Sequence, residues 1–122
     1  MQIKTYVLDK DGKPYSFHSH SINPKALIEI AKEKAPEVKE KGANWAFDGV
    51  PVFAKEYIKA VENGEDERTI EMASVSMVQM LWLAESIFLG LSEEKFINSD
   101  LEFTIQQDGT VIHKRHEHKV TH

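Results

Sequence analysis

The sequence predicts an α+β fold in which an antiparallel sheet, made from one β-hairpin at each end of the chain, packs on about three helices. Asp-Gly dipeptides at 11–12 and 108–109 each separate two extended segments, as they do in tight hairpin turns. Between the hairpins, apolar side chains recur at helical spacing. With 122 residues, of which 41% are hydrophobic, the chain has the size and composition of one domain spanning residues 1–122.

The first hairpin pairs residues 3–8 with residues 15–20. A two-residue loop at Asp11-Gly12 sets the register, because each loop length fixes which residues face one another. One face then carries Leu8 opposite Tyr15 and Tyr6 opposite Phe17, and the other carries Thr5 opposite His18 and Ile3 opposite His20. We expect the aromatic face to be the one that packs on the core.

Signals for helix starts and stops divide the middle of the chain. Asn23-Pro24 is a typical helix start, Pro36 marks a kink or break, and Gly42 is a plausible end. Residues 43–50 read as a short extended segment with a turn at Asp48-Gly49, after which Pro51 opens a helix that ends at Asn63-Gly64.

The second hairpin joins residues 101–107 to residues 110–120 through Asp108-Gly109. Two-residue looping places Phe103 opposite Lys114 and Ile105 opposite Ile112.

The longest expected helix, roughly residues 66–89, has apolar side chains in two stripes instead of one. The second stripe, which is separate from the main one, consists of Val75, Val78, Trp82 and Leu89. Two explanations fit: the helix packs on two sides within its own chain, or the second stripe is an interface with a protein partner or a second copy. Trp and Met are enriched in such interfaces.

Charge and composition narrow the range of partners. A net charge of −5 argues against general binding to the nucleic-acid backbone, which needs clustered Lys and Arg. Charged residues interrupt the N-terminal segment, no run of about 18 apolar residues occurs, and there are no cysteines. We therefore expect a soluble, cytoplasmic protein that does not contact a membrane.

Histidine is the one residue type whose arrangement suggests chemistry. His18 and His20, and likewise His116 and His118, lie two residues apart on expected strands, so each pair could present two imidazoles to one metal ion such as zinc. Surface or packing histidines explain the same pattern, and we favour that explanation, because pairs at this spacing arise on any polar strand face and no recognisable motif fixes an Asp or Glu nearby. No phosphate loop, dinucleotide fingerprint, serine elbow or zinc-helix motif is present, so we expect no catalytic residues and no cofactor.

These observations favour a small, non-catalytic protein-interaction module of the inhibitor, adaptor or assembly-factor type, acting by contact as a homo-oligomer. The first alternative is a small-ligand or nucleotide binder with a pocket between protomers, lined by Trp45, Tyr57 and Trp82. The second is an enzyme with a histidine-bound metal.

Overall fold

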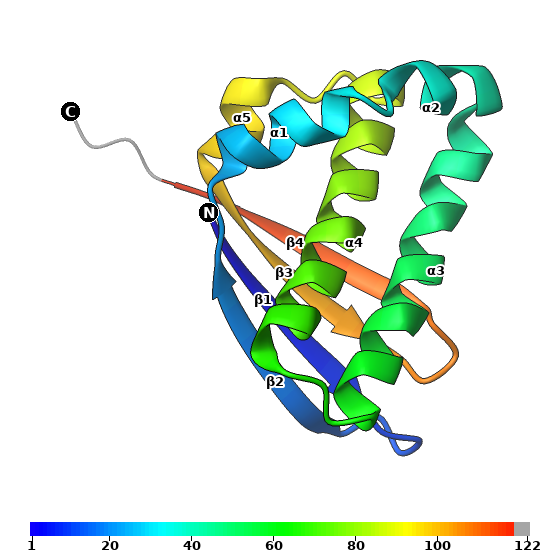
Figure 1. The fold of residues 1–122 in the computed structure, drawn as a ribbon, viewed down its shortest axis with the longest axis vertical. Coiled ribbons are helices and arrows are strands. Elements are labelled where there is room, and N and C mark those ends of the chain that lie inside the picture. Colours follow the sequence, from blue (N-terminus) through cyan, green and yellow to red (C-terminus); the bar gives the residue numbers. More distant parts are fainter. Residues whose placement is uncertain (119–122) are drawn as a thin grey trace.

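A computed structural model describes residues 1–118 (Figure 1). Along the chain, two strands come first, five helices follow, and two further strands come last. The strands are β1 (Gln2–Leu8), β2 (Pro14–Ser21), β3 (Ser99–Ile105) and β4 (Val111–Glu117). The helices are α1 (Pro24–Lys32), α2 (Ala35–Lys41), α3 (Ala43–Glu62), α4 (Glu67–Phe88) and α5 (Glu93–Ile97). The expected α+β class is confirmed, with five helices in the described residues instead of about three.

The four strands form one mixed sheet in the order β2-β1-β3-β4. Both outer pairs are antiparallel, but β1 and β3, the two central strands, run parallel. The expectation of a purely antiparallel sheet is therefore wrong. The long helical connection returns the chain to the end of the sheet where β1 begins, so that β3 starts beside Gln2 and runs in the same direction.

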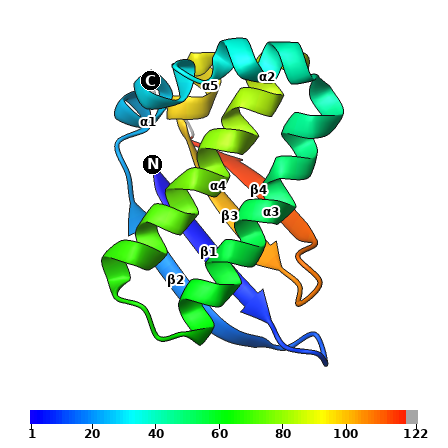
Figure 2. The ribbon, with the colours of Figure 1, turned by 45° about the vertical axis from the view of Figure 1, so that its right-hand side comes forward.

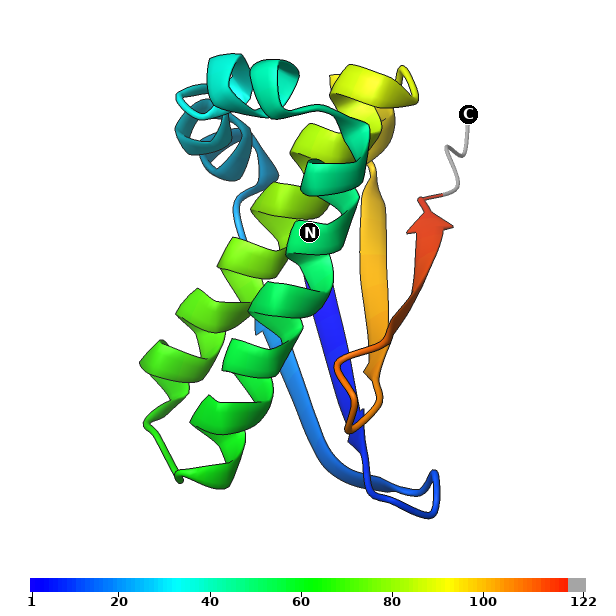
Figure 3. The same cartoon turned by 90° about the vertical axis from the view of Figure 1, so that its right-hand side faces the viewer.

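Helices cover one side of this sheet. Figure 3 shows the sheet edge-on with α3 and α4 against one face, and Figure 2 shows these two helices side by side across it. The face toward the helices is formed in the centre by Ile3, Thr5 and Val7 of β1, which pair with Leu101, Phe103 and Ile105 of β3. All six are fully or almost fully buried and form the floor of the core.

The aromatic face of the first hairpin, expected in the core, faces outward. Tyr6 and Phe17 lie on the side of the sheet away from the helices, and Phe17 is 49% exposed. Strand alternation defines two faces but does not say which is buried. The parallel pairing with β3 decides this, because it brings the inward side chains of β3 into register with Ile3, Thr5 and Val7.

Both strand-connecting loops are one residue longer than expected. The Asp9 N–H donates to the Lys13 carbonyl, and the Gln106 N–H donates to the Thr110 carbonyl, so three residues lie inside each loop. Gly12 and Gly109 take the left-handed conformation, with φ of 79° and 89°, that the last loop position of such turns requires.

The longer loops change the registers differently. In the first pair, an irregularity between Val7 and Leu8 absorbs the extra residue, so Tyr6 still faces Phe17, while Leu8 faces Pro14 instead of Tyr15. The pairing of β3 with β4 contains no such irregularity, so the extra loop residue shifts its whole register by one. Phe103 therefore faces His113 instead of Lys114, and Ile105 faces Val111 instead of Ile112. This shift by one residue turns Ile112 outward, where it is 51% exposed.

Residues 43–50, expected to be extended, are the first turns of α3, and Pro51 lies inside that helix instead of opening it. Tertiary packing explains the difference. Gly49 lets α4 come so close that a Cβ at this position would lie 3.0 Å from Cγ of Met80. Burial against α4 outweighs the hydrogen bond that Pro51 cannot donate.

The expected helix at 66–89 is confirmed as α4, which Asp66 caps by accepting the Thr69 N–H at 2.8 Å.

Helix α4 crosses the sheet from one edge strand to the other. Near its start Glu67 meets His18 of β2, and near its end Glu85 meets Arg115 of β4. The Arg115 guanidinium lies 2.8 Å from the Glu85 carboxylate and also donates to Ser99 Oγ at 3.2 Å. The two side chains of this ion pair are only 14% and 15% exposed. The pair therefore fixes the end of α4 against β4.

We expect Arg115→Ala to lower the free energy of unfolding by about 2 kcal/mol, because it leaves the Glu85 carboxylate largely buried without its partner. Urea unfolding followed by circular dichroism measures this. The control is Lys95→Ala, which removes the exposed ion pair of Lys95 with Glu117, also on β4, and should change stability by less than about 0.5 kcal/mol. Equal effects of the two substitutions would contradict the assigned role of Arg115.

Candidate functional site

The second stripe of α4 divides between core and surface. Val78 and Trp82 are buried, Val75 is half-buried, and Leu89 is 68% exposed. The Trp82 ring packs on Phe96 of α5, with ring centroids 4.7 Å apart. Helix α5 and the other helices thus cover most of the stripe, which supports the explanation of a helix packed on two sides within its own chain.

The three aromatic residues considered for a ligand pocket do not lie together. Trp45, near the start of α3, is partly exposed beneath the Lys41 ammonium and lines a surface groove of about 370 Å³ with Val52 and Met80. Tyr57 is fully buried further along α3, and Trp82 is buried against α5. Of the three, therefore, Trp45 alone lines this groove within one protomer.

The two histidine pairs lie on opposite edges of the sheet. His18 and His20 are on β2 and face the helices, whereas His116 and His118 lie at the end of β4. Each of the latter is paired with a carboxylate of β3: His116 Nε2 lies 3.1 Å from Glu102, and His118 Nε2 lies 3.0 Å from Asp100. Strands β1 and β3 separate the two pairs, so His18, His20, His116 and His118 do not form one site.

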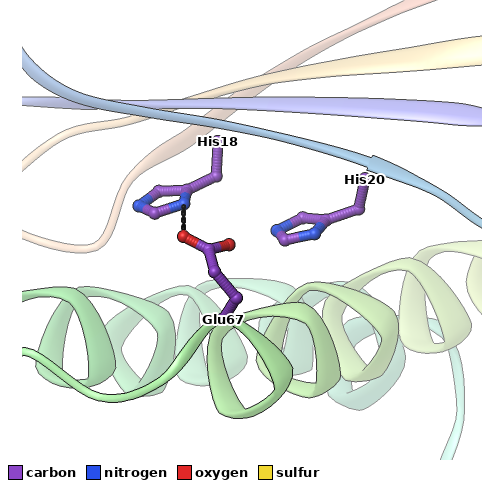
Figure 4. Close-up of side chains that lie close together, drawn as sticks. All are labelled: His18, His20 and Glu67. Atoms are coloured by element: carbon purple, nitrogen blue, oxygen red, sulfur yellow. Dashed lines mark ion pairs between the residues drawn. The ribbon is translucent and has the colours of Figure 1, made fainter.

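Glu67, at the start of α4, completes a cluster with the first pair. Figure 4 shows both imidazoles reaching from β2 toward α4, with the Glu67 carboxylate rising to meet them. His18 Nδ1 lies 3.3 Å from Glu67 Oε1, and the two rings are almost parallel, 6.1 Å apart. One ligand atom from each of the three residues lies within 4.8 Å of the others.

Buried polar atoms without a partner lie in and beside this cluster. Among residues 1–118, His20 Nε2 and the hydroxyls of Thr5 and Tyr57 have no hydrogen-bond partner. Thr5 faces His18 across the strand pair, and the Tyr57 ring meets the His18 ring edge-on at 6.3 Å. Such groups are rare in folded proteins, because each loses its bonds to water without replacement.

Burial raises the pKa of the Tyr57 phenol far above its ordinary value, and the negative charge of Glu67 raises it further. The nearby Thr5 hydroxyl offsets part of this rise, although the two hydroxyls do not meet hydrogen-bond geometry. Tyr57 therefore keeps its proton at neutral pH.

Sequence reasoning did not connect Glu67 with the two histidines. Its position identifies it only as an acidic residue suited to the positive end of a helix dipole. Its approach to His18 depends on the angle at which α4 crosses β2, which no local pattern encodes. His18 and His20, by contrast, could be found from their spacing.

Besides the cluster of His18, His20 and Glu67, a second candidate site is the outer face of the sheet, on the side opposite the helices. Two cross-strand rows run over it. The aromatic row is Phe17, Tyr6, Thr104 and Ile112, and the charged row is Ser19, Lys4, Glu102 and Lys114, each written in strand order from β2 to β4. The rings of Tyr6 and Phe17 lie 4.8 Å apart. No helix among the described residues covers these rows (Figure 3).

Comparison with known proteins assigns no family. No family model, curated protein or solved structure matches the chain. In addition, no helix within residues 1–118 combines the length and the apolar character needed to cross a membrane.

Replacing Tyr57 by Phe should leave the metal-free protein as stable as before or raise its free energy of unfolding by about 1 kcal/mol, because the substitution removes a buried, unpartnered hydroxyl. Urea unfolding in the presence of a chelator measures this. The matched control is Tyr6→Phe, which removes a hydroxyl from the outer face of the sheet and should be neutral. A loss of more than about 1 kcal/mol for Tyr57→Phe would show that the hydroxyl has a bonded partner.

Proposed function

We propose that this chain is a non-catalytic protein-interaction module that works by contact, as a homodimer joined through the outer face of its sheet. The observation that carries the proposal is the aromatic row. Phe17 and Ile112, at its two ends, are about half exposed, and Tyr6 lies between them on β1. Exposed aromatic and aliphatic side chains in one row, on a surface that no helix among the described residues covers, are typical of a protein-binding site.

The charges on the outer face favour a second copy of the chain as the occupant. Lys4 of β1 and Glu102 of β3 are neighbours in the charged row. A two-fold axis parallel to the strands and between β1 and β3 places Lys4 of one copy over Glu102 of the other, twice. The same axis places Tyr6 over Thr104 and Phe17 over Ile112. Aligned packing of two sheets in this way is common in β-sandwiches.

A second two-fold arrangement is electrostatically unfavourable. An axis perpendicular to the strands and through the charged row would place Lys4 over Lys4, Glu102 over Glu102 and Lys114 over Lys114. Like charges facing one another across an interface disfavour association. The charge pattern is thus self-complementary about the axis parallel to the strands and repulsive about this second axis, and such repulsion helps an interface to select one geometry.

A nucleic-acid strand is the less suitable occupant of the same face. Stacked aromatic residues can serve as platforms for bases, but such surfaces also carry an excess of positive charge along the backbone path. Here Lys4 and Lys114 are balanced by Asp100 and Glu102. The outer face therefore lacks the electrostatic attraction that a phosphate backbone needs.

Charge reversal tests the dimer directly. Lys4→Glu places two carboxylates opposite one another at two symmetric points, and we expect the dimer dissociation constant to rise at least tenfold, or about 1.4 kcal/mol. The double variant Lys4→Glu/Glu102→Lys exchanges the charges and should restore dimerisation. Sedimentation equilibrium at about pH 8, where ordinary histidines are neutral, measures both.

Lys114→Glu is the matched control, since it makes the same charge change on the same row, also beside Glu102. In the proposed dimer Lys114 faces Ser19, so this variant should remain dimeric. A wild-type protein that is monomeric at about 200 µM would overturn the proposal, because a functional dimer needs a dissociation constant well below that. Equal weakening by Lys4→Glu and Lys114→Glu would overturn it too.

Two further outcomes would assign the surfaces differently. Dissociation by Leu89→Glu but not by Phe17→Glu would place the interface at the C-terminal end of α4 instead of on the outer face. Binding of a single-stranded oligonucleotide by a monomeric wild type would assign the outer face to nucleic acid.

A further inference from the structure

The geometry points to a second function for this chain, a binding site for a divalent transition metal of the zinc type, formed by His18, His20 and Glu67. The site lies between β2 and α4, on the opposite side of the sheet from the proposed dimer interface. It is independent of dimerisation, because none of its residues belongs to the outer face.

The separation of His18 and Glu67 already suits a tetrahedral ion, and His20 lies near enough to join them after a small adjustment. Zinc bound to nitrogen and oxygen at about 2.0–2.1 Å holds neighbouring ligand atoms about 3.3 Å apart. His18 Nδ1 and Glu67 Oε1 have this separation, at 3.3 Å, and the ligand atoms of all three residues lie within 4.8 Å. The Glu67 side chain is 75% exposed, so rotation of its torsions brings the carboxylate closer to His20 without disturbing the core.

The buried state of His20 is an independent observation that points to a ligand. The residue is only 8% exposed, and its Nε2 has no hydrogen-bond partner among residues 1–118. Figure 4 shows its ring directed toward the same space as His18 and Glu67. A buried imidazole nitrogen without a partner is unfavourable, whereas coordination of a cation by its lone pair satisfies it.

The ligand set indicates the class of metal. Two imidazoles with one carboxylate suit zinc and related transition metals, while calcium and magnesium prefer sites made of oxygen atoms. Three protein ligands also leave a fourth position of the tetrahedron open to water or to a small ligand. His116 and His118 differ from this cluster, because each is about half exposed and already paired with its own carboxylate.

Calorimetry with zinc alone tests the site on untagged full-length protein that has first been treated with a chelator. We expect the wild type to bind one zinc ion per chain. Glu67→Gln and His20→Gln should each weaken binding roughly tenfold or more, since each removes a ligand. The matched control, His116→Ala/His118→Ala, removes the other histidine pair and should bind zinc with about the affinity of the wild type.

Two results would overturn the inference. One is a wild type that binds no zinc at about 100 µM, a concentration far above the dissociation constants of protein zinc sites, which would leave His18 and Glu67 as an ion pair only. The other is loss of zinc binding in the His116→Ala/His118→Ala variant with retention in Glu67→Gln.

A direct measurement keeps the test decisive even if His20→Gln does not fold. Because Glu67 is exposed, Glu67→Gln should fold in any case. Nitrogen NMR of the wild type measures how zinc changes the chemical shifts of the imidazole nitrogens. These changes identify the bound histidines without any substitution. Shifts at His18 and His20 would support the site, and shifts confined to other histidines would reject it.

Discussion

The parallel pairing of β1 with β3 is the constraint on which the rest of this structure depends. It joins two antiparallel strand pairs from the ends of the chain into one sheet, with Ile3 beside Leu101 and Val7 beside Ile105. These side chains are buried beneath α3 and α4, so burial of apolar area fixes the parallel register. A shift of β3 by one residue would place its polar side chains in the core and its apolar ones in water.

Both candidate sites, the histidine cluster and the outer face of the sheet, follow from that register. Successive residues of a strand point to opposite faces, so the pairing that buries Thr5 also turns Tyr6 outward. On β2, which follows β1, the same alternation sends His18 toward α4 and Phe17 to the outer face. A polar cluster inside and an aromatic row outside are therefore two consequences of one arrangement, and the proposed metal site and the proposed interface lie on opposite sides of the sheet.

Local signals in the sequence predicted local structure well. The start of α1 at Asn23-Pro24, the extent of α4 and the facing of Tyr6 with Phe17 are all present in the structure. Features set by distant packing could not be predicted. The helix that continues through Pro51 depends on contact with α4, and the choice of buried face depends on β3. Two of the three residues of the metal candidate could be predicted, because His18 and His20 are close in sequence, whereas Glu67 reaches them only through the crossing of α4 over β2.

The most direct test of this account is a nuclear Overhauser spectrum of methyl-labelled protein, focused on the Tyr6 ring. If β1 and β3 pair in parallel with Tyr6 outward, its ring protons contact the Thr104 methyl on the neighbouring strand and the Phe17 ring. They then show no contact with Met77 or Leu81, which lie in the core on the helical side. Contacts from Tyr6 to the methyl groups of Met77 or Leu81 would contradict the account, because they would place the aromatic row beneath the helices.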